Sequence, residues 1–524
     1  MVKRFSILAM TTLIALPTLA TAGGGSTPAD LERKIDELSR QLDELKAQMA
    51  KQNETVKKVS GKVNTMDTML EEKSEKWDLA SRFQFNGDFR ARGDYYKASN
   101  LLPAGTPIFA RSFDAAGHPV FTPTGGDQHN DTIMTNRLRL NMAAKATEDV
   151  EFKGRLAMYK AWGMQTPPNG TGDGFPVFDG NTTRIPDSSA LFVDRAYINW
   201  NNIGGGPFWL SVGRRPTTDG PPAQLRMNND SRMGTPIAYM DYPFDGATIG
   251  YGYNWGNEDL GSGKLRFCYG RGFENGLSNT TNVPNISDTD FAGFNWDVMQ
   301  KGPRLWNIQT FGAFNLFNYP AFSSDFVNFG VNQINGPRQN LGNIYHTSTL
   351  YMDKVRNLNY FAAGAWSHSA PNDNGMFNDV NPNTGRPIPN THSEEGYSVY
   401  TGVRYDIDNL GLKLGAEYNY GSQYWVAFTP GDDDLYMSKL ATRGNAYELY
   451  LIYDLPTGEA LSKFARTFIR LGWQIYDYHY SGGFDWNVKP FDLSLASEGA
   501  KLQAIGQNPV TSANQVYLTF EAYF

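Results

Sequence analysis

Residues 515–524, with the sequence QVYLTFEAYF, decide the fold. The apolar side chains occupy alternate positions, and the positions between them hold polar residues or tyrosine. Successive side chains of a β-strand point to opposite faces, so this stretch predicts a two-faced strand that runs to Phe524. An open edge strand with an apolar face would promote aggregation in water. The pattern therefore favours a strand that closes a barrel in a membrane. Its apolar face comprises Val516, Leu518, Phe520, Ala522 and Phe524.

The other end of the sequence has the pattern of an export signal. Lys3 and Arg4 precede a mostly apolar stretch, residues 5–19, and small residues follow at 20–22. The apolar stretch is too short for a membrane-spanning helix, which argues against an N-terminal anchor. We therefore predict a signal peptide over residues 1–22, with cleavage after Ala22, and a linker over 23–30.

The composition narrows the class of protein. Only one cysteine, Cys268, occurs in 524 residues, so no intrachain disulfide can stabilise the exported protein. After the signal, no apolar run reaches the roughly 18–20 residues of a membrane helix. Aromatic residues make up 14% and there are 53 glycines, which suits a barrel with a polar interior and aromatic girdles. A large soluble β-protein could share this composition. The net charge of -7 argues against a nucleic-acid partner.

A heptad pattern precedes the barrel. Apolar residues recur at alternating spacings of four and three, and the only break is Gln52. A sustained period of about 3.5 residues predicts a left-handed coiled coil, here over residues 31–72, without fixing the number of helices. A lone solvated helix is the alternative, but it would leave the apolar seam in water. We place a linker at 73–80. The seam comprises Leu31, Ile35, Leu38, Leu42, Leu45, Met49, Val56, Val59, Val63, Met66 and Leu70.

Residues 81–524 predict an all-β transmembrane antiparallel barrel of about sixteen strands. Segments of about ten residues with alternating polarity recur along this region, and the connections between them are short and long in turn. Outer-membrane barrels have short periplasmic turns and long external loops, and an even strand count leaves both ends of the barrel on the periplasmic side. The predicted strands are 82–92, 136–146, 150–159, 191–200, 207–215, 246–254, 264–271, 289–299, 304–317, 340–352, 358–367, 396–406, 411–420, 444–453, 464–476 and 515–524.

Two motifs, DRAYINW at residues 194–200 and VGRR at 212–215, together with Phe524, carry a family resemblance. With them the chain resembles a Gram-negative trimeric porin that has an N-terminal periplasmic coiled coil. The resemblance implies an outer-membrane location, a homotrimer and passive diffusion of small hydrophilic solutes. It also implies that the barrel assembly machinery reads Phe524 as an insertion signal. Outer-membrane lipid and lipopolysaccharide would surround the barrel. The resemblance supplies no catalytic residues.

Charged residues on the predicted strands should face a water-filled lumen, because charge facing lipid is costly. Basic positions outnumber the acidic ones, Asp88, Glu151, Asp406, Glu417, Glu448 and Glu521. A basic pore attracts anions, so we expect an anion preference. In the alternative, the arginines pair with lumenal acids and stiffen the wall. The predicted pore-lining residues are Arg82, Arg90, Arg92, Arg137, Arg139, Lys153, Arg155, Arg195, Arg215, Arg266, Arg404, Arg466 and Arg470.

Residues 216–245 are the candidate for a loop that folds inward and narrows the pore. This loop presents both signs of charge among glycines and prolines, and the candidates for the constriction are Asp219, Arg226, Asp230 and Arg232. An ordinary external loop is the alternative reading.

The sequence offers little support for other functions. The three aspartates at 432–434, after Gly431, lack the ligand spacing of a calcium loop. The histidines lack metal-ligand spacing, and no cofactor motif occurs. An outer-membrane enzyme would need a nucleophile near a histidine, and no motif marks one. We therefore expect no catalytic activity, cofactor or metal. Two alternatives stay open: a structural anchor that contacts the cell wall through the coiled coil, and a barrel partner of a periplasmic protein.

Overall fold

The computed structural model divides into two compact units, one before and one after the boundary between Ser81 and Arg82. The predicted signal peptide lies outside the described residues. Among the helices described, none is both long and apolar enough to cross a membrane. The described residues are 28–113, 119–123, 126–163, 186, 189–215, 217, 219–229, 234, 239–276, 286–318, 339–383, 386–429, 438–458, 465–483, 485–505 and 507–524.

The first unit is one long helix, α1 (Pro28–Arg82). Proline suits the first helical position because its missing N–H has no partner there anyway. The helix also covers residues 73–80, where we predicted a linker. No glycine or proline interrupts residues 71–82, so nothing in that stretch stops the helix. The described side chains of the apolar seam, from Leu31 to Val56, are uncovered in the single chain: Leu38 is 64% exposed and Val56 is 63% exposed.

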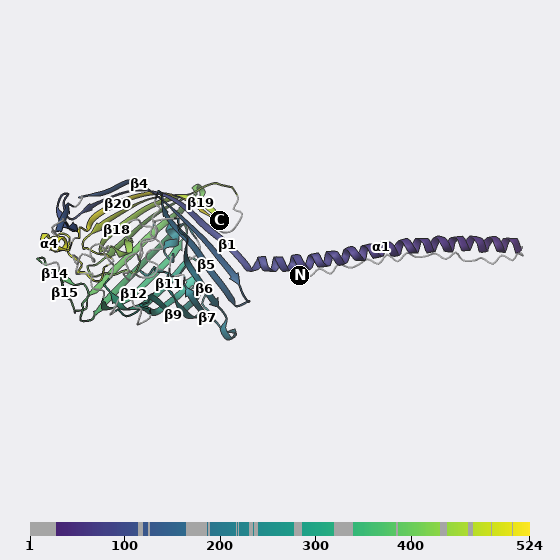
Figure 1. The fold of residues 1–524 in the computed structure, drawn as a ribbon, viewed down its shortest axis with the longest axis horizontal. Coiled ribbons are helices and arrows are strands. Elements are labelled where there is room, and N and C mark those ends of the chain that lie inside the picture. Colours follow the sequence, from purple (N-terminus) through teal and green to yellow (C-terminus); the bar gives the residue numbers. More distant parts are fainter. Residues whose placement is uncertain are drawn as a thin grey trace. The chain divides into compact units, whose positions relative to one another are not determined.

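The second unit is a closed antiparallel barrel of sixteen strands, which confirms the predicted fold class (Figure 1). Neighbours in the chain are neighbours around the barrel, and the last strand pairs with the first. The barrel strands are β1 (Phe83–Asn100), β4 (Gln128–Lys145), β5 (Val150–Ala161), β6 (Phe192–Trp200), β7 (Phe208–Arg214), β8 (Asp245–Asn254), β9 (Ser262–Phe273), β10 (Thr289–Lys301), β11 (Arg304–Phe317), β12 (Asn340–Val355), β13 (Leu358–Pro371), β16 (Glu395–Ile407), β17 (Leu412–Gly421), β18 (Gly444–Asp454), β19 (Arg466–Tyr478) and β20 (Val510–Tyr523).

The strand β20 has the two faces that its sequence predicts. Leu518 and Phe520 are 53% and 46% exposed on the outer face, whereas Thr519 and Glu521 are 0% and 1% exposed on the inner face. Phe524 follows the strand, and its backbone N–H and carbonyl both bond to Gly87, at 3.0 and 2.9 Å. The pairing of β20 with the first strand is therefore confirmed, and the outer surface of this seam is apolar.

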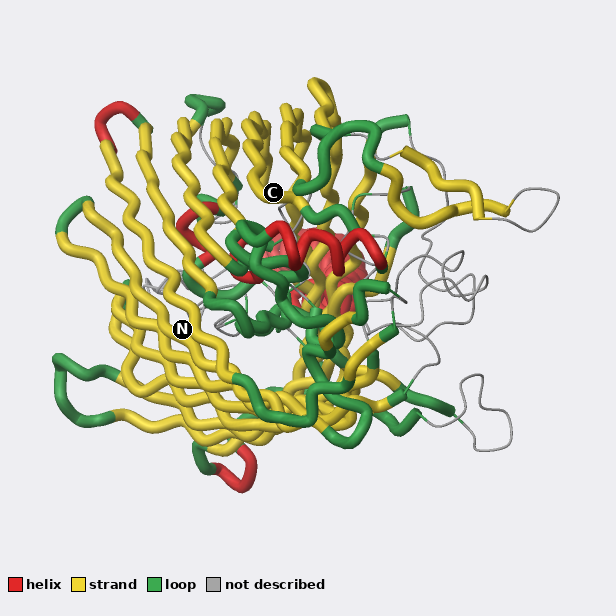
Figure 2. The backbone as a smooth tube through the Cα atoms, turned by 90° about the vertical axis from the view of Figure 1, so that its left-hand side faces the viewer, coloured by secondary structure: helices red, strands yellow, loops and turns green. Residues whose placement is uncertain are grey.

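Long connections at one end of the barrel contain structure of their own. They hold two short hairpins, β2 (Pro107–Phe113) with β3 (Pro119–Pro123) and β14 (Asp379–Val380) with β15 (Pro387–Ile388), and the helix α4 (Ala496–Ala504). We expected only loops there. Three of these connections also contribute buried side chains to the barrel interior, among them Phe377, Phe428 and Trp486. Loop segments therefore lie within the ring of strands at this end (Figure 2).

Candidate functional site

Most of the predicted pore-lining arginines point into the barrel, and many are almost completely buried. Those on β1, β4, β5, β16 and β19 are 3% exposed or less, namely Arg90, Arg92, Arg137, Arg139, Arg155, Arg404 and Arg470. Arg195 on β6 is 8% exposed. Arg82 is the exception, because it ends α1 and is exposed. Alternation along the strands therefore located the inward face, although it did not show how tightly that face is packed.

Buried acids neutralise these arginines. The Asp88 carboxylate lies 3.1 Å from Arg137 Nη2 and 2.8 Å from Arg139 Nε. Glu521 accepts a hydrogen bond from Arg470 at 2.8 Å. Arg92 and Arg404 each form an ion pair with an aspartate two residues further along the same strand, Asp94 and Asp406. These arginines therefore pair with lumenal acids, which is the arrangement that we gave as the alternative to an anion-attracting pore.

The described residues of the connection between β7 and β8, namely 215, 217, 219–229, 234 and 239–244, enter the barrel, and we call them the crossing loop. Asp219 lies near its start and is 3% exposed. Its Oδ2 atom is 3.0 Å from Arg139 Nη1, 2.6 Å from Arg155 Nη1 and 3.3 Å from Arg195 Nη2. One carboxylate from the loop therefore joins arginines of three adjacent strands, β4, β5 and β6.

The same loop then reaches the far wall through its short helix α2 (Ala223–Arg226). Arg404 Nη1 donates to the carbonyl of Leu225 at 2.7 Å, and Arg470 Nη1 donates to that of Arg226 at 2.8 Å. The Arg226 side chain binds Glu448 on β18 at 2.9 Å. Backbone carbonyls and one ion pair therefore fix α2 to the wall. The other two predicted constriction residues, Asp230 and Arg232, lie outside the described residues.

Lys439 adds a further buried cation beside α2. It lies in the 3-10 helix η3 (Lys439–Ala441), and its ammonium binds both Glu417 and Glu448. Sequence reasoning missed Lys439 because η3 belongs to a long connection, where alternation says nothing about the direction of a side chain.

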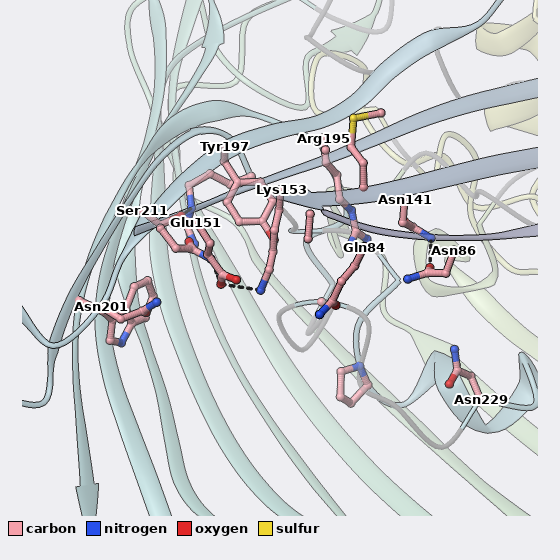
Figure 3. A pocket seen from close by; sticks show the side chains of 18 of the residues that line it. Gln84, Asn86, Asn141, Glu151, Lys153, Arg195, Tyr197, Asn201, Ser211 and Asn229 are labelled. Atoms are coloured by element: carbon pink, nitrogen blue, oxygen red, sulfur yellow. Dashed lines mark hydrogen bonds and ion pairs between the residues drawn. The ribbon is translucent and has the colours of Figure 1, made fainter. Parts of the chain in front are cut away.

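Below the crossing loop, toward the short turns, a polar cavity of about 930 Å³ opens inside the barrel. Figure 3 shows Lys153 and Glu151 paired in this cavity, at 2.7 Å, and Asn141 bonded to Asn86, at 2.9 Å. Both signs of charge and many amides line it, so it is wettable throughout. The labelled lining residues are Gln84, Asn86, Asn141, Glu151, Lys153, Arg195, Tyr197, Asn201, Ser211 and Asn229.

The cavity lies against β7, β8 and β9, where its lining residues are Trp209, Ser211, Gly252, Lys264 and Arg266. Small residues also face one another in register on these strands: Gly213 faces Gly246 and then Gly270, while Ser211 faces Thr248 and then Cys268.

Two cations of this sector have no carboxylate partner among the described residues. Arg215 donates through Nε to the Ser211 hydroxyl at 3.2 Å, and no contact is seen for its terminal nitrogens. Lys264 on β9 is exposed to the cavity. By contrast, the neighbouring Arg266 is neutralised by Asp297 at 3.2 Å. Arg215 and Lys264 therefore bring positive charge to the cavity without a carboxylate partner among the described residues.

At the long-loop end, Arg443 ties several connections together. Its guanidinium donates to the carbonyls of Trp425, Ser481 and Asp485, at 2.9, 3.1 and 2.7 Å. The Asp485 carboxylate accepts the backbone N–H groups of Asn487 and Val488. Burial nevertheless raises the pKa of Asp485 to about 6. We call this cluster of Arg443 and residues 485–488 the loop clasp.

Several inward acids escaped the sequence analysis. Asp94 lies beyond the predicted end of the first strand, since β1 continues to Asn100. Asp194 and Arg195 are both buried because β5 and β6 change register near Arg155. Asp297 lies on β10, where the alternation of polar and apolar residues is the weakest among the predicted strands. No group of three or more His, Cys, Asp or Glu side chains in the described part of the chain could hold a metal ion.

The fold and the site together define a closed sixteen-stranded β-barrel with a polar cavity and an inward loop. The chain belongs to the family described as "Protein of unknown function (DUF3373)", which matches residues 127–524. A search of curated proteins found no match.

Solved barrels are similar at low identity. The trimer form of OmpT, an outer membrane protein of Vibrio cholerae, is 11% identical with a TM-score of 0.38, over 84% of this chain and 99% of that chain. OmpF of Salmonella typhi, in a complex with daunomycin, is 9% identical with a TM-score of 0.38, over 85% and 99%. The assignment of sixteen strands rests on this chain's own strand pairing.

Proposed function

We propose that this protein is an outer-membrane porin, a water-filled channel for passive diffusion of small hydrophilic solutes. The observation that carries the proposal is the polar cavity of about 930 Å³ inside a closed barrel whose outer face is apolar. Barrels of about sixteen strands are wide enough for an aqueous channel. Exposed apolar residues on successive strands, such as Leu449, Trp473 and Leu518, suit contact with lipid.

The crossing loop sets the narrowest part of the proposed channel. It spans from the β4–β6 wall to the opposite wall, and buried hydrogen bonds and ion pairs hold it at both places. Solutes would pass beside it along β7 to β9, whose residues line the cavity. The channel needs no catalytic step.

The proposed preference for anions is weaker than the number of lumenal arginines suggests. Most lumenal arginines are neutralised by buried carboxylates and attract ions only weakly. Arg215 and Lys264 supply the excess charge in the cavity, and a confined, wetted site with fixed positive charge raises the local anion concentration. We therefore expect a modest preference carried by these two residues.

The helix α1 supports a trimeric assembly in the same proposal. The described side chains of its apolar seam, from Leu31 to Val56, are more than half exposed in one chain. They would be covered by the same seam of two further copies in the periplasm. Outer-membrane lipid, lipopolysaccharide and the barrel assembly machinery are the other partners that we propose.

A structural anchor is the second candidate. Its support is the interior at mid-height, where buried ion pairs and the crossing loop occupy much of the lumen. In that case the coiled coil would attach the outer membrane to the cell wall, and the barrel would conduct few ions.

Planar-bilayer recording of the full-length protein distinguishes the porin from the structural anchor. A porin gives stable unitary conductance steps, and liposomes that contain it swell in small sugars. A salt gradient then gives a reversal potential of the sign expected for anions. Sealed bilayers and liposomes that do not swell would instead favour the anchor, and a reversal potential of the opposite sign would remove the anion preference alone.

A further inference from the structure

The inner wall of the cavity carries an indole ring over a glycine. Trp209 on β7 pairs in register with Gly250 on β8. Its chain neighbour Phe208 is 48% exposed on the outer face, so the alternation of side chains places Trp209 inside. Three atoms of the indole lie within 2.6 Å of the point that a Cβ atom on Gly250 would occupy. The indole therefore covers the inner surface of β8 at a position where β8 has no side chain of its own.

The Trp209 indole is open to the cavity. It is partly exposed and belongs to the lining. No hydrogen bond is seen for its N–H among the described residues. By contrast, the buried Trp425 and Trp486 each donate their indole N–H to a backbone carbonyl at 2.8 Å, as buried tryptophans usually do. Trp209 therefore presents an apolar ring and an unused donor to the cavity.

Lys264 supplies a cation beside this ring. Gly250 pairs with Arg266 on β9, and Lys264 precedes Arg266 by two residues. Gly250 and Lys264 are therefore diagonal neighbours on one face of the sheet, about 7–8 Å apart. Asp297 neutralises Arg266 at 3.2 Å, whereas Lys264 is exposed and has no carboxylate partner among the described residues. One long, flexible ammonium side chain is thus available next to the indole.

Polar groups with spare hydrogen-bonding capacity lie on the other side of the indole. Ser211, two residues after Trp209, pairs with Asn199 on β6, and Asn199 pairs with Glu151 on β5. Glu151 accepts a hydrogen bond from Asn199 at 3.3 Å and lies 2.7 Å from Lys153 (Figure 3). Carboxylate and amide oxygens each accept more than one hydrogen bond. This row of donors and acceptors beside an aromatic ring suits a ligand that carries several hydroxyls.

We propose that the cavity binds an acidic sugar, a pyranose with a carboxylate, whose ring lies on Trp209 and whose carboxylate lies on Lys264. The C–H face of a pyranose is apolar and packs on an aromatic ring, while its hydroxyls bond to carboxylates and amides. A carboxylate and an ammonium form a charge-assisted hydrogen bond. The cavity of about 930 Å³ lies within the roughly 300–1,000 Å³ of small-molecule sites. The proposal rests on the proposed function, because it names the class of solute that the channel would select.

Saturation-transfer difference NMR of the full-length protein in detergent micelles measures binding without transport. D-glucuronate should bind roughly fivefold more tightly than D-glucose, which lacks the carboxylate. Glycolate, which has a carboxylate and a hydroxyl but no ring, should also bind more weakly than D-glucuronate. A dissociation constant for glucuronate that is no lower than those of glucose and glycolate overturns the proposal.

Substitutions at Trp209 test the stacking. Trp209→Ala should raise the dissociation constants of both sugars roughly tenfold, and Trp209→Phe, which keeps a ring, should restore most of the affinity. Trp473→Ala, on the outer face of β19, is the matched control and should bind both sugars as the unaltered protein does. Unchanged affinity in Trp209→Ala would refute the stacking and, with it, the proposal.

A second test displaces the indole without removing it. Gly250→Ala should weaken the binding of both sugars, because the new Cβ atom would collide with the indole. Gly252→Ala on the same strand is the control, since its Cβ atom would meet only the Pro207 carbonyl oxygen, at 3.9 Å. If Gly250→Ala forms a normal barrel on unheated gels and binds both sugars normally, the ring is not the binding surface and the proposal fails.

Lys264→Gln locates the carboxylate. This variant should bind glucuronate only as tightly as glucose and should keep the affinity for glucose. Lys301→Gln, outside the lining of the cavity, should retain the preference for glucuronate. A preference for glucuronate that persists in Lys264→Gln shows that the carboxylate does not lie on Lys264, and it overturns the proposal.

Planar-bilayer conductance of the same protein distinguishes this proposal from the proposed function. Conductance without preferential binding of glucuronate rejects the sugar site alone. Preferential binding without conductance rejects the porin and leaves the sugar site in place.

Discussion

Asp219 and Leu225 are six residues apart in the crossing loop, yet they contact opposite walls of the barrel. Asp219 binds arginines on β4, β5 and β6. Leu225 belongs to an apolar cluster with Phe361 and Ala363 of β13, and β13 lies eight places from β5 in the ring of sixteen strands. The loop is therefore held across the lumen.

Asp219→Asn should destabilise the barrel and widen the channel. The substitution leaves three nearly buried arginines with one carboxylate fewer, and the loss of one partner from a buried ion pair costs about 3–5 kcal/mol. We expect a lower melting temperature and a larger, noisier unitary conductance. Asp245→Asn is the matched control, because the Asp245 side chain is 62% exposed in its pair with Arg214, and exposed pairs contribute at most about 1 kcal/mol. Equal conductance in both variants would argue against a role of the loop in the channel.

Gly87→Val should impair closure of the barrel. A Cβ atom at this position would lie 2.6 Å from the Arg139 carbonyl oxygen and 2.8 Å from the Phe524 ring. Overpacking of this kind costs about 1–3 kcal/mol, and here it also displaces the residue that bonds to Gly87. We expect a smaller folded fraction on unheated gels. Gly364→Ala, where a Cβ meets nothing within 4 Å, is the control; normal folding of both variants would contradict the prediction.

Arg215→Gln and Lys264→Gln together should remove the anion preference. These residues carry the charge in the cavity that no carboxylate neutralises among the described residues, so their loss should move the reversal potential toward zero in a salt gradient. Lys301→Gln, on an exposed turn away from the cavity, serves as the control. A reversal potential that does not move in the double variant would assign the selectivity to other groups.

The loop clasp should loosen as the pH rises. The pKa of Asp485 is raised from its ordinary value of 3.8 to about 6, so the folded clasp prefers the protonated carboxyl. Its stabilising contribution, up to about 3 kcal/mol for a shift of this size, is fully present below pH 3.8 and is lost as the pH rises through 6. Limited proteolysis near residues 479–495 should therefore be faster at pH 7.5 than at pH 5.

Asp485→Asn should make that proteolysis independent of pH. The amide oxygen can still accept the two backbone N–H groups, and no charge is buried. Asp492→Asn is a control in the same connection, because Asp492 has its pKa lowered by hydrogen bonds from Ser494. If the rate keeps its pH dependence in Asp485→Asn, another group causes it.

Leu38→Glu combined with Leu45→Glu should dissociate the assembly or weaken it strongly. Both residues lie on the apolar seam of α1 and are 64% and 59% exposed in one chain, so a coiled coil would bury them and the new charges would repel one another. The mass of the full-length protein in detergent, measured by light scattering, should fall. Arg40→Gln, off the seam, should keep the oligomer; identical masses for all three proteins would place the contacts elsewhere.

The alternation of side chains predicted the strands well because it reflects the difference between the apolar outer face of the barrel and its polar interior. Leu518 and Thr519 differ in polarity because they face different surroundings. The end of the helix α1 could not be predicted as well from the sequence. Residues 73–80 continue α1 although they precede a barrel, since a change of domain does not require a helix breaker in the sequence.

The contacts within the lumen could not be predicted in the same way. Alternation shows that Arg139 faces inward, but its partners Asp88 and Asp219 are distant in sequence, and only the closed barrel brings them together.

The buried ion pairs also bear on how the barrel is assembled. Asp88 on β1 binds Arg137 and Arg139 on β4. A shift of one residue between these strands would turn both arginines to the apolar outer face and would leave Asp88 without them. In the proposed outer-membrane location, each arginine facing lipid would cost about 2–4 kcal/mol at the membrane midplane. The buried charges therefore favour the native register of the wall over a shifted one.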